Sequence, residues 1–251
     1  MRRIFFLTFL LLFFVSENSY ALNNRNLTIF AEPNLALALT KIVRIYSQKS
    51  HTIVSVNFNS AADLIADIDS GEPADVFISA HSSWIESLRQ KGLVDVYNIG
   101  YIARDKLVLV TSKTNSALSS NFTIEGALRA LNQNKATLIL DNEGSSSGFF
   151  AKNLITNLGL SDLKIFSKIV EDKTALLTNI QSNDQNYSLL LASQINNQPN
   201  LQLLSQTRDG NIFYQALVIA GDNMEVAREF LKFLKSETAK SILKENGFLT
   251  D

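Results

Sequence analysis

Two short segments constrain the fold of this chain more than any other feature: LTIFAEPNLALALTKI at residues 27–42 and GEPADVFISA at residues 71–80. Each contains a short apolar strand that leads into an amphipathic helix. In an open α/β sheet, such joints place helix N-termini beside strand C-termini, and small ligands bind at that edge. The two segments therefore predict a ligand-binding α/β architecture, without identifying the ligand.

Hydrophobic spacing predicts an alternation of strands and helices along most of the chain. The first part is predicted to hold strands at 27–31, 53–58 and 75–79, with helices at 34–48, after Ser60 and at 82–90. This β-α-β-α-β-α order calls for parallel strands joined by right-handed crossovers. A second block follows, with strands at 105–111, 137–140, 187–191 and 201–204. Its helices are predicted at 124–131, after the Gly/Ser-rich turn of DNEGSSSGFFAKNLI, and at 173–180. A strand at 212–220 and helices at 224–234 and 237–246 complete the chain.

The predicted fold class is α/β, with two lobes joined by a hinge that the chain crosses twice. The first lobe is expected to contain residues 22–104 and 207–251, and the second residues 105–206. In this arrangement the C-terminal strand and helices return to complete the first lobe. A hinge of this kind leaves a cleft between the lobes, and such clefts are favoured ligand sites.

The N-terminus has the pattern of a secretory signal peptide. Arg2 and Arg3 form a basic region, residues 4–15 are apolar except for Thr8, and Ser19-Tyr20-Ala21 offers a cleavage site. We expect cleavage after Ala21, because the apolar run is too short for a comfortable membrane anchor. No later segment is long and apolar enough to cross a membrane, so the mature chain is expected to be exported and not embedded in one.

Composition excludes several classes of function. The chain has no Cys, which excludes disulfides, thiolate catalysis, Cys-ligated metals and a lipid on an N-terminal Cys. An exported solute receptor without that lipid needs a second membrane to retain it, which favours a Gram-negative periplasm. The 23 basic and 24 acidic residues nearly balance, so no nucleic-acid surface is expected. His51 and His81 lack metal-ligand spacing and are interpreted as surface residues, so no metal or cofactor is expected.

The chain resembles the periplasmic substrate-binding proteins of molybdate-type ABC transporters over nearly all of its mature length. The resemblance rests on LTIFAEPNLALAL and on GEPADVFISAHSSWIESLRQKGLV (residues 71–94), with support from DKLVLVTSK (105–113) and ENGF (245–248). It implies a two-lobed monomeric clamp that closes on a tetrahedral oxyanion. It also implies that backbone N–H and Ser hydroxyl groups at helix starts hold the anion, and that a permease and its ATPase are the partners.

The resemblance also implies which positions bind the ligand, and several of these positions hold a different residue in this chain. Ala61 stands where the family has a Ser and keeps only the backbone N–H, and Leu191 stands where a Tyr is common. Lys173 adds a cation at a position that is usually apolar. The ligand-binding residues expected on this basis are Asn34, Ser60, Ala61, Ser147, Gly148 and Lys173.

Local structure alone explains some of these residues. Asn34 and Ser60 are also good helix N-caps, and Ser60 with Asp63 resembles a capping box. Ser147 and Gly148 lie in a Gly/Ser-rich turn that no Lys completes into a phosphate-binding loop. Glu32 is awkward beside an anion site, and we interpret it as a solvent-facing turn residue that a helix N-terminus satisfies.

Three functions follow from these observations. The leading one is a non-enzymatic periplasmic receptor that captures an oxyanion, first of all molybdate or tungstate, for an ABC importer. The altered ligand shell leaves open a receptor for a different anionic solute, or a periplasmic sensor or interaction module outside transport. A hydrolase is disfavoured, because the chain has no Cys and neither His has an evident catalytic partner.

Overall fold

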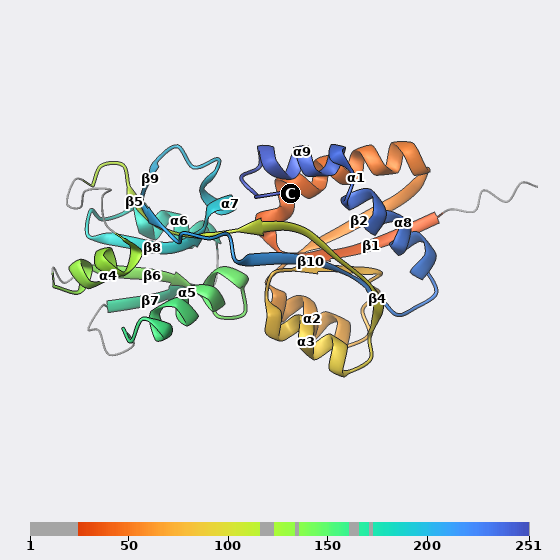
Figure 1. Cartoon of the computed structure of the whole chain (residues 1–251), viewed down its shortest axis with the longest axis horizontal. Coiled ribbons are helices and arrows are strands. Elements are labelled where there is room, and N and C mark those ends of the chain that lie inside the picture. Colours follow the sequence, from red (N-terminus) through yellow and green to blue (C-terminus); the bar gives the residue numbers. More distant parts are fainter. Residues whose placement is uncertain (1–24, 116–122, 134–135, 161–165, 171–172, 251) are drawn as a thin grey trace, which may run out of the picture.

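The computed structural model describes residues 25–115, 123–133, 136–160, 166–170 and 173–250. The expected signal peptide at residues 1–21 lies outside them. Two five-stranded sheets lie side by side along the longest axis of the molecule (Figure 1). No helix in the described ranges is long and apolar enough to cross a bilayer.

The sheet of the first lobe has the strand order β2-β1-β3-β10-β4. β1 pairs in parallel with β2 and β3, whereas β10 is antiparallel to β3 and β4. The predicted parallel start and the return of the C-terminal strand are both confirmed. The bounds of these strands are β1 (Arg25–Ala31), β2 (Thr52–Phe58), β3 (Val76–Ser79), β4 (Val94–Asp105) and β10 (Ile212–Ile219).

Helices cover both faces of this sheet (Figure 1). Successive strand residues therefore alternate between two buried clusters: Ile29 packs in the core of α1, α8 and α9, and Phe30 in the core of α2 and α3. Burial on both faces explains why β1 and β3 are nearly continuous apolar runs in the sequence. The helices are α1 (Ala36–Ser50), preceded by the short helix η1 (Pro33–Leu35), α8 (Met224–Leu234) and α9 (Glu237–Glu245), with α2 (Ala61–Asp69) and α3 (Ser82–Gln90) opposite.

The sheet of the second lobe has the order β7-β6-β8-β5-β9. α4 and α5 contribute to one buried cluster of this lobe, and α6 contributes to another. The elements are β5 (Leu107–Ser112), α4 (Ile124–Gln133), β6 (Thr137–Asp141), α5 (Ser146–Asn157), β7 (Phe166–Val170), α6 (Lys173–Gln181), β8 (Asn186–Leu191), α7 (Ala192–Ile195) and β9 (Leu201–Gln206).

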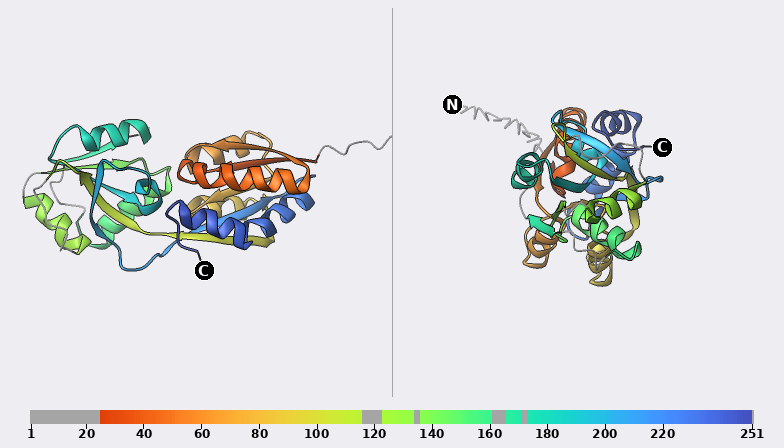
Figure 2. Two further views of the ribbon diagram at one scale, coloured as in Figure 1. Left: turned by 90° about the horizontal axis from the view of Figure 1, so that it is seen from above. Right: turned by 90° about the vertical axis from the view of Figure 1, so that its left-hand side faces the viewer.

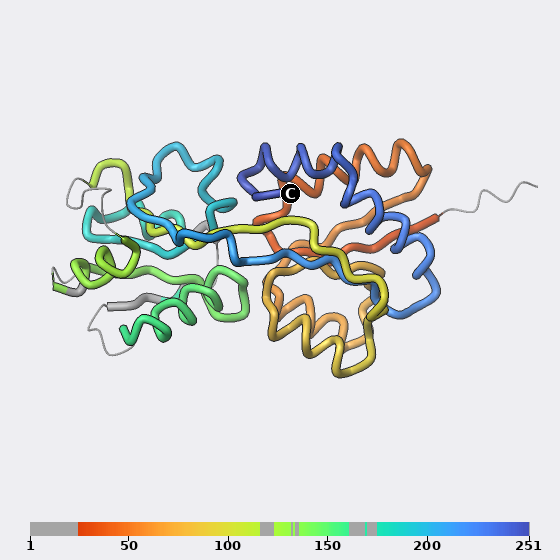
Figure 3. The backbone as a smooth tube through the Cα atoms, in the orientation of Figure 1, coloured from red at the N-terminus to blue at the C-terminus, as the bar shows by residue number. Residues whose placement is uncertain are grey.

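The chain passes between the lobes twice, from β4 into β5 and from β9 into β10. These two connections run alongside each other through the middle of the molecule (Figures 2 and 3). The two-lobed α/β fold class expected from the sequence is therefore confirmed. Three elements had no counterpart in the sequence-based assignment, namely β4, β7 and α7.

Candidate functional site

A cavity of about 250 Å³ lies between the two lobes. Six of its lining residues come from the first lobe and six from the second. They are polar with few exceptions, and no Lys or Arg is among the described lining residues. The lining consists of Glu32, Pro33, Asn34, Asn59, Ser60, Asp63, Asp141, Asn142, Ser145, Ser147, Leu191 and Gln194.

The strand–helix joints of both lobes build this cavity. β1 leads into η1 and α1, β2 into α2, and β6 into α5, so the starts of these helices face one another. Ser60 caps α2: its Oγ accepts from Asp63 N (3.2 Å) and donates to Asp63 Oδ2 (2.7 Å). Ser145 caps α5 by accepting from Gly148 N (3.1 Å). The capping role expected for Ser60 is confirmed, whereas Asn34 is not an N-cap, because it lies within η1.

Asn34 connects the lobes at the hinge side of the cavity. Its Nδ2 donates to Ser193 Oγ in α7 (3.1 Å) and to the hydroxyl of Tyr214 in β10. Tyr214 is fully buried, and this burial raises its pKa well above the usual value. The NH₂ group of Asn34 therefore donates to two hydroxyls, the neutral phenol of Tyr214 and the hydroxyl of Ser193, and these set its position.

Glu32 differs from the sequence-based interpretation in one respect. A helix N-terminus does satisfy it, but its side chain is buried, with 3% exposure, and does not face solvent. In the first lobe its Oε1 accepts from Ser79 Oγ (2.5 Å) and Ala80 N (3.1 Å). In the second lobe Ser146 at the start of α5 donates twice, from Oγ to Oε1 (2.6 Å) and from N to Oε2 (3.0 Å). Glu32 is thus a carboxylate that both lobes hold with neutral donors.

The hydroxyl of Ser147 also has a carboxylate partner. Ser147 Oγ donates to Asp141 Oδ2 (2.5 Å), and Asp141 Oδ1 accepts from Asn142 N (3.0 Å). Gln194 in α7 donates from Nε2 towards Ser147 Oγ (3.5 Å). The polar groups of this wall are therefore connected into one network.

The structure brings three of the six expected ligand-binding residues together around the cavity: Asn34, Ser60 and Ser147. Ala61 and Gly148 are buried directly beside lining residues and are not part of the lining. Lys173 begins α6, as expected, and its side chain lies outside the described part of the structure. Contact of these residues with a ligand stays a prediction.

His81 is not a surface residue, unlike His51, because the second lobe covers it. Its side chain is 3% exposed, its Nε2 donates to the Glu143 carbonyl (3.0 Å), and its ring stacks on Phe149 with 4.1 Å between centroids. Burial lowers the pKa of His81 below its usual value, so the neutral ring is favoured. Beside it, Ala62 N donates to the Gly144 carbonyl (3.1 Å) across the lobes.

The residues that sequence analysis missed at this site are Asn59, Asp141, Asn142, Ser193, Gln194 and Tyr214. Two of them carried a usable signal: Asp141 and Asn142 follow the apolar strand β6 directly, where the side chains face the same sheet edge as the start of α5. No group of three or more His, Cys, Asp or Glu among the described residues could hold a metal ion.

Asp105 lies at the hinge, between β4 and β5, and is 1% exposed. Its Oδ1 accepts from Lys106 N (2.8 Å) and Ser193 N (3.3 Å), and burial raises the pKa of its carboxyl group to about 6. The pKa of Asp105 is therefore higher in the folded chain than in the unfolded chain. Its contribution to the free energy of unfolding is complete below pH 3.8 and is lost as the pH rises through about 6.

We therefore expect Asp105→Asn to remove this pH dependence. The free energy of unfolding of the variant minus that of wild type should be larger, in the stabilising direction, by about 2 kcal/mol at pH 7 than at pH 4. Chemical denaturation at both pH values measures the difference, with the exposed Asp209→Asn as the control. An equal effect of Asp105→Asn on stability at both pH values would contradict a raised pKa of Asp105 in the folded protein.

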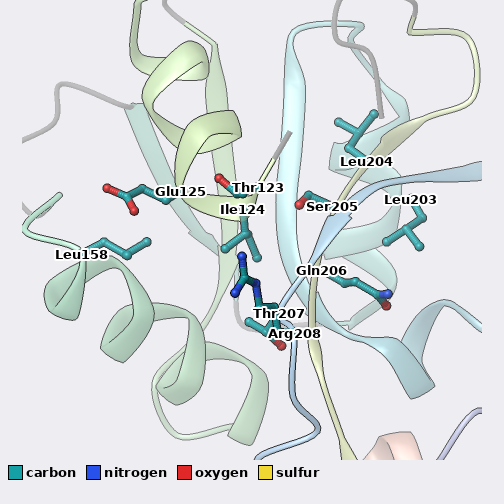
Figure 4. A pocket seen from close by; sticks show the side chains of 10 residues that line it. All are labelled: Thr123, Ile124, Glu125, Leu158, Leu203, Leu204, Ser205, Gln206, Thr207 and Arg208. Atoms are coloured by element: carbon teal, nitrogen blue, oxygen red, sulfur yellow. The ribbon is translucent and has the colours of Figure 1, made fainter. Parts of the chain in front are cut away.

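A larger cavity, of about 690 Å³, lies in the second lobe between the start of α4 and the end of β9 (Figure 4). Residues of the second lobe and the segment after β9 line it, among them Thr123, Ile124, Leu158 and Arg208. Residues of the first sheet do not take part in its described lining. It lacks the contribution from two lobes that a clamp requires, so the smaller cavity is the better candidate.

Known proteins resemble this chain over most of its length. The sequence model of the bacterial extracellular solute-binding protein family matches residues 27–249. The molybdate-binding protein ModA of Escherichia coli is 25% identical over 243 residues, which cover 94% of this chain and 93% of the relative.

Solved structures show the same fold. The tungstate ABC transporter protein of Geobacter sulfurreducens aligns with a TM-score of 0.75 at 14% identity, over 88% of this chain and 98% of that one. The periplasmic molybdate-binding protein of Azotobacter vinelandii aligns with a TM-score of 0.71 at 19% identity, over 90% and 99%. At these identities the structural likeness establishes the fold alone.

Proposed function

Because this chain belongs to the family of bacterial extracellular solute-binding proteins, we propose that it is the periplasmic receptor of an ABC importer and captures an oxyanion between its lobes. The observation that carries the proposal is the cavity to which both lobes contribute helix starts. Backbone N–H groups at helix starts favour anions. The protein has no catalytic role in this proposal.

On sequence similarity, molybdate and tungstate are the first candidates for the ligand. They are supported by the ModA relative, whose alignment with this chain spans nearly its whole length. Three carboxylates around the cavity, from Glu32, Asp63 and Asp141, favour a second candidate, a receptor for a different anionic solute. A sensor or interaction module outside transport would show no oxyanion affinity.

The proposal includes the division of the chain and its location. Residues 22–104 and 207–251 would form one lobe and residues 105–206 the other, supported by β4 ending at Asp105 and β10 beginning at Ile212. A signal peptide cleaved after Ala21 would deliver a monomeric receptor to the periplasm, where it would meet the permease and its ATPase. The ligand must contact both lobes if its binding is to shift them towards a closed state.

Titration calorimetry with molybdate, tungstate, sulfate, phosphate and arsenate tests the proposal. For the anion that binds, Asn34→Ala and Ser147→Ala should each weaken affinity by about 1–3 kcal/mol, because each removes a polar group from one wall of the site. Ser241→Ala, an exposed position on α9, is the matched control. No heat and no thermal shift with any of the five anions would favour the non-transport alternative, and unchanged affinity in both variants would reject the site.

A further inference from the structure

Three carboxylates surround the candidate cavity, and no described side chain of its lining carries a positive charge. Glu32 belongs to the first lobe beside η1, Asp63 to the first turn of α2, and Asp141 to the end of β6. A solute in this cavity therefore meets negative charge from both lobes. The hydrogen-bond donors that the lining residues leave free determine which class of anion can bind here.

Glu32 already occupies the start of α5. Ser146 N and Ser146 Oγ both donate to its carboxylate, at 3.0 and 2.6 Å. These are the donors that a helix N-terminus would otherwise offer to an external anion. The positive end of α5 is therefore partly neutralised by a carboxylate of the chain itself.

Each of the three Ser hydroxyls of the lining already has an acceptor for its hydrogen, and that of Ser145 is the Asn142 carbonyl (2.9 Å). Ser60 Oγ donates its hydrogen to Asp63 Oδ2 (2.7 Å), and Ser147 Oγ donates its hydrogen to Asp141 Oδ2 (2.5 Å). A hydroxyl has one hydrogen to donate. Each pair consequently presents lone pairs and negative charge, and no hydroxyl hydrogen, to a ligand.

Some amide donors are still available for the oxygens of an anion. Asn59 and Asn142 use their side-chain oxygens to accept from Ser60 N and Gly144 N, both at 2.8 Å, which leaves their NH₂ groups to donate. Both residues line the cavity, one in each lobe. The cavity thus combines amide donors with carboxylate acceptors.

A fully deprotonated dianion can pair with the amide donors of the cavity but not with its carboxylates. Its oxygens could accept from the amides, but they would also lie beside Asp63 and Asp141 without a hydrogen between them, and like charges at such distances repel strongly. An oxyanion that keeps a proton can accept from the amides and donate its O–H to a carboxylate. A hydrogen bond between a hydroxyl and a carboxylate is among the stronger ones.

We propose that Asp63 and Asp141 make this site selective for an oxyanion that keeps a proton at neutral pH, the class of phosphate and arsenate, over fully deprotonated oxyanions such as molybdate, tungstate and sulfate. The inference rests on the proposed function, since it assigns the ligand class of the same site. Asp141, with its hydrogen bond to Ser147, is the principal selecting residue, and Asp63 acts from the opposite lobe.

Titration calorimetry of the wild-type protein at pH 7 compares phosphate and arsenate with sulfate, molybdate and tungstate. We expect phosphate and arsenate to bind at least tenfold more tightly. In Asp141→Asn the carboxylate acceptor is lost and an NH₂ donor is gained, so affinity for phosphate should fall about tenfold or more and the gap to sulfate should close or reverse. Asp63→Asn should have the same direction of effect, and it keeps the test decisive if Asp141→Asn does not fold. Asp222→Asn, at an exposed position before α8, is the control.

The outcomes distinguish the proposed anion selectivity from the proposed receptor function. Tighter binding of molybdate, tungstate or sulfate than of phosphate would overturn the selectivity and leave the oxyanion receptor standing. An unchanged anion preference in both Asp variants would also overturn it. The absence of binding by all five anions would overturn the selectivity together with the proposed receptor function.

Discussion

Replacing Gly148 by Ala is expected to destabilise the protein by about 3 kcal/mol or more and to abolish ligand binding. Gly148 lies in the first turn of α5, where the helix start packs directly on the end of β6. A Cβ at this position would lie 2.0 Å from the carbonyl oxygen of Asn142 and 2.6 Å from that of Asp141. Both neighbours are backbone atoms, so the overlap cannot be relieved by a side-chain rotation.

The effect of Gly148→Ala on the site follows from its neighbours. To admit the methyl group, the start of α5 must move away from β6, and this movement displaces Ser146 from Glu32 and Ser147 from Asp141. Thermal unfolding and titration with the bound anion measure the two consequences. Gly221→Ala is the matched control, because a Cβ there meets nothing within 4 Å, and it should change stability by less than about 0.5 kcal/mol. Equal behaviour of the two variants would show that the close contact at Gly148 is not present in solution.

Glu32→Gln is expected to lower the free energy of unfolding by about 2–4 kcal/mol. Glutamine keeps the size of the side chain but replaces one carboxylate oxygen by an NH₂ group. An NH₂ group cannot accept the hydrogen bonds that this oxygen accepts, so donors would face a donor. The carboxylate has four donors, from Ser79, Ala80 and twice from Ser146, and buried groups left without partners are costly. For a chain of this size the change corresponds to a fall in melting temperature of roughly 5–12 °C.

Differential scanning calorimetry measures this change. Glu229→Gln provides the control, because Glu229 forms an exposed ion pair with Arg25, and such pairs contribute little to stability. A melting temperature of Glu32→Gln that equals that of Glu229→Gln would contradict the role of Glu32 as a bridge between the lobes.

Much of the first lobe could be predicted from the sequence, because local signals mark its elements. Ser60 with Asp63 places the start of α2, and the apolar spacing after Ser82 and Met224 gives α3 and α8 with their observed bounds. β4 gave no such signal. It contains Gly100 and the largely exposed Tyr97, and its pairing with β10 changes register twice, so its apolar residues do not alternate regularly. In β7 (FSKIV) a Ser and a Lys interrupt the apolar run, and α7 has only four residues, too few for a helical period to be recognised.

The candidate site was less predictable because its decisive contacts join distant parts of the chain. The sequence shows the order of strands and helices, and this order places Asn34 and Ser60 at the sheet edge where the strands end and the helices begin. The partner of Glu32 is Ser146, 114 positions away, and His81 is covered by Glu143 and Phe149 of the other lobe. Local sequence around Glu32 and His81 resembles that of exposed turn residues, and only the packing of the lobes shows their burial.

The central claim, that both lobes grip one oxyanion between their helix starts, is tested most directly by anomalous diffraction. Crystals grown with tungstate and, separately, with arsenate would locate the heavy atom of each anion. An anomalous peak is expected in the cavity, within hydrogen-bonding reach of Asn59 and Asn142, in at least one of the two crystals. Anomalous peaks only outside this cavity, or no peak in either crystal, would contradict the central claim.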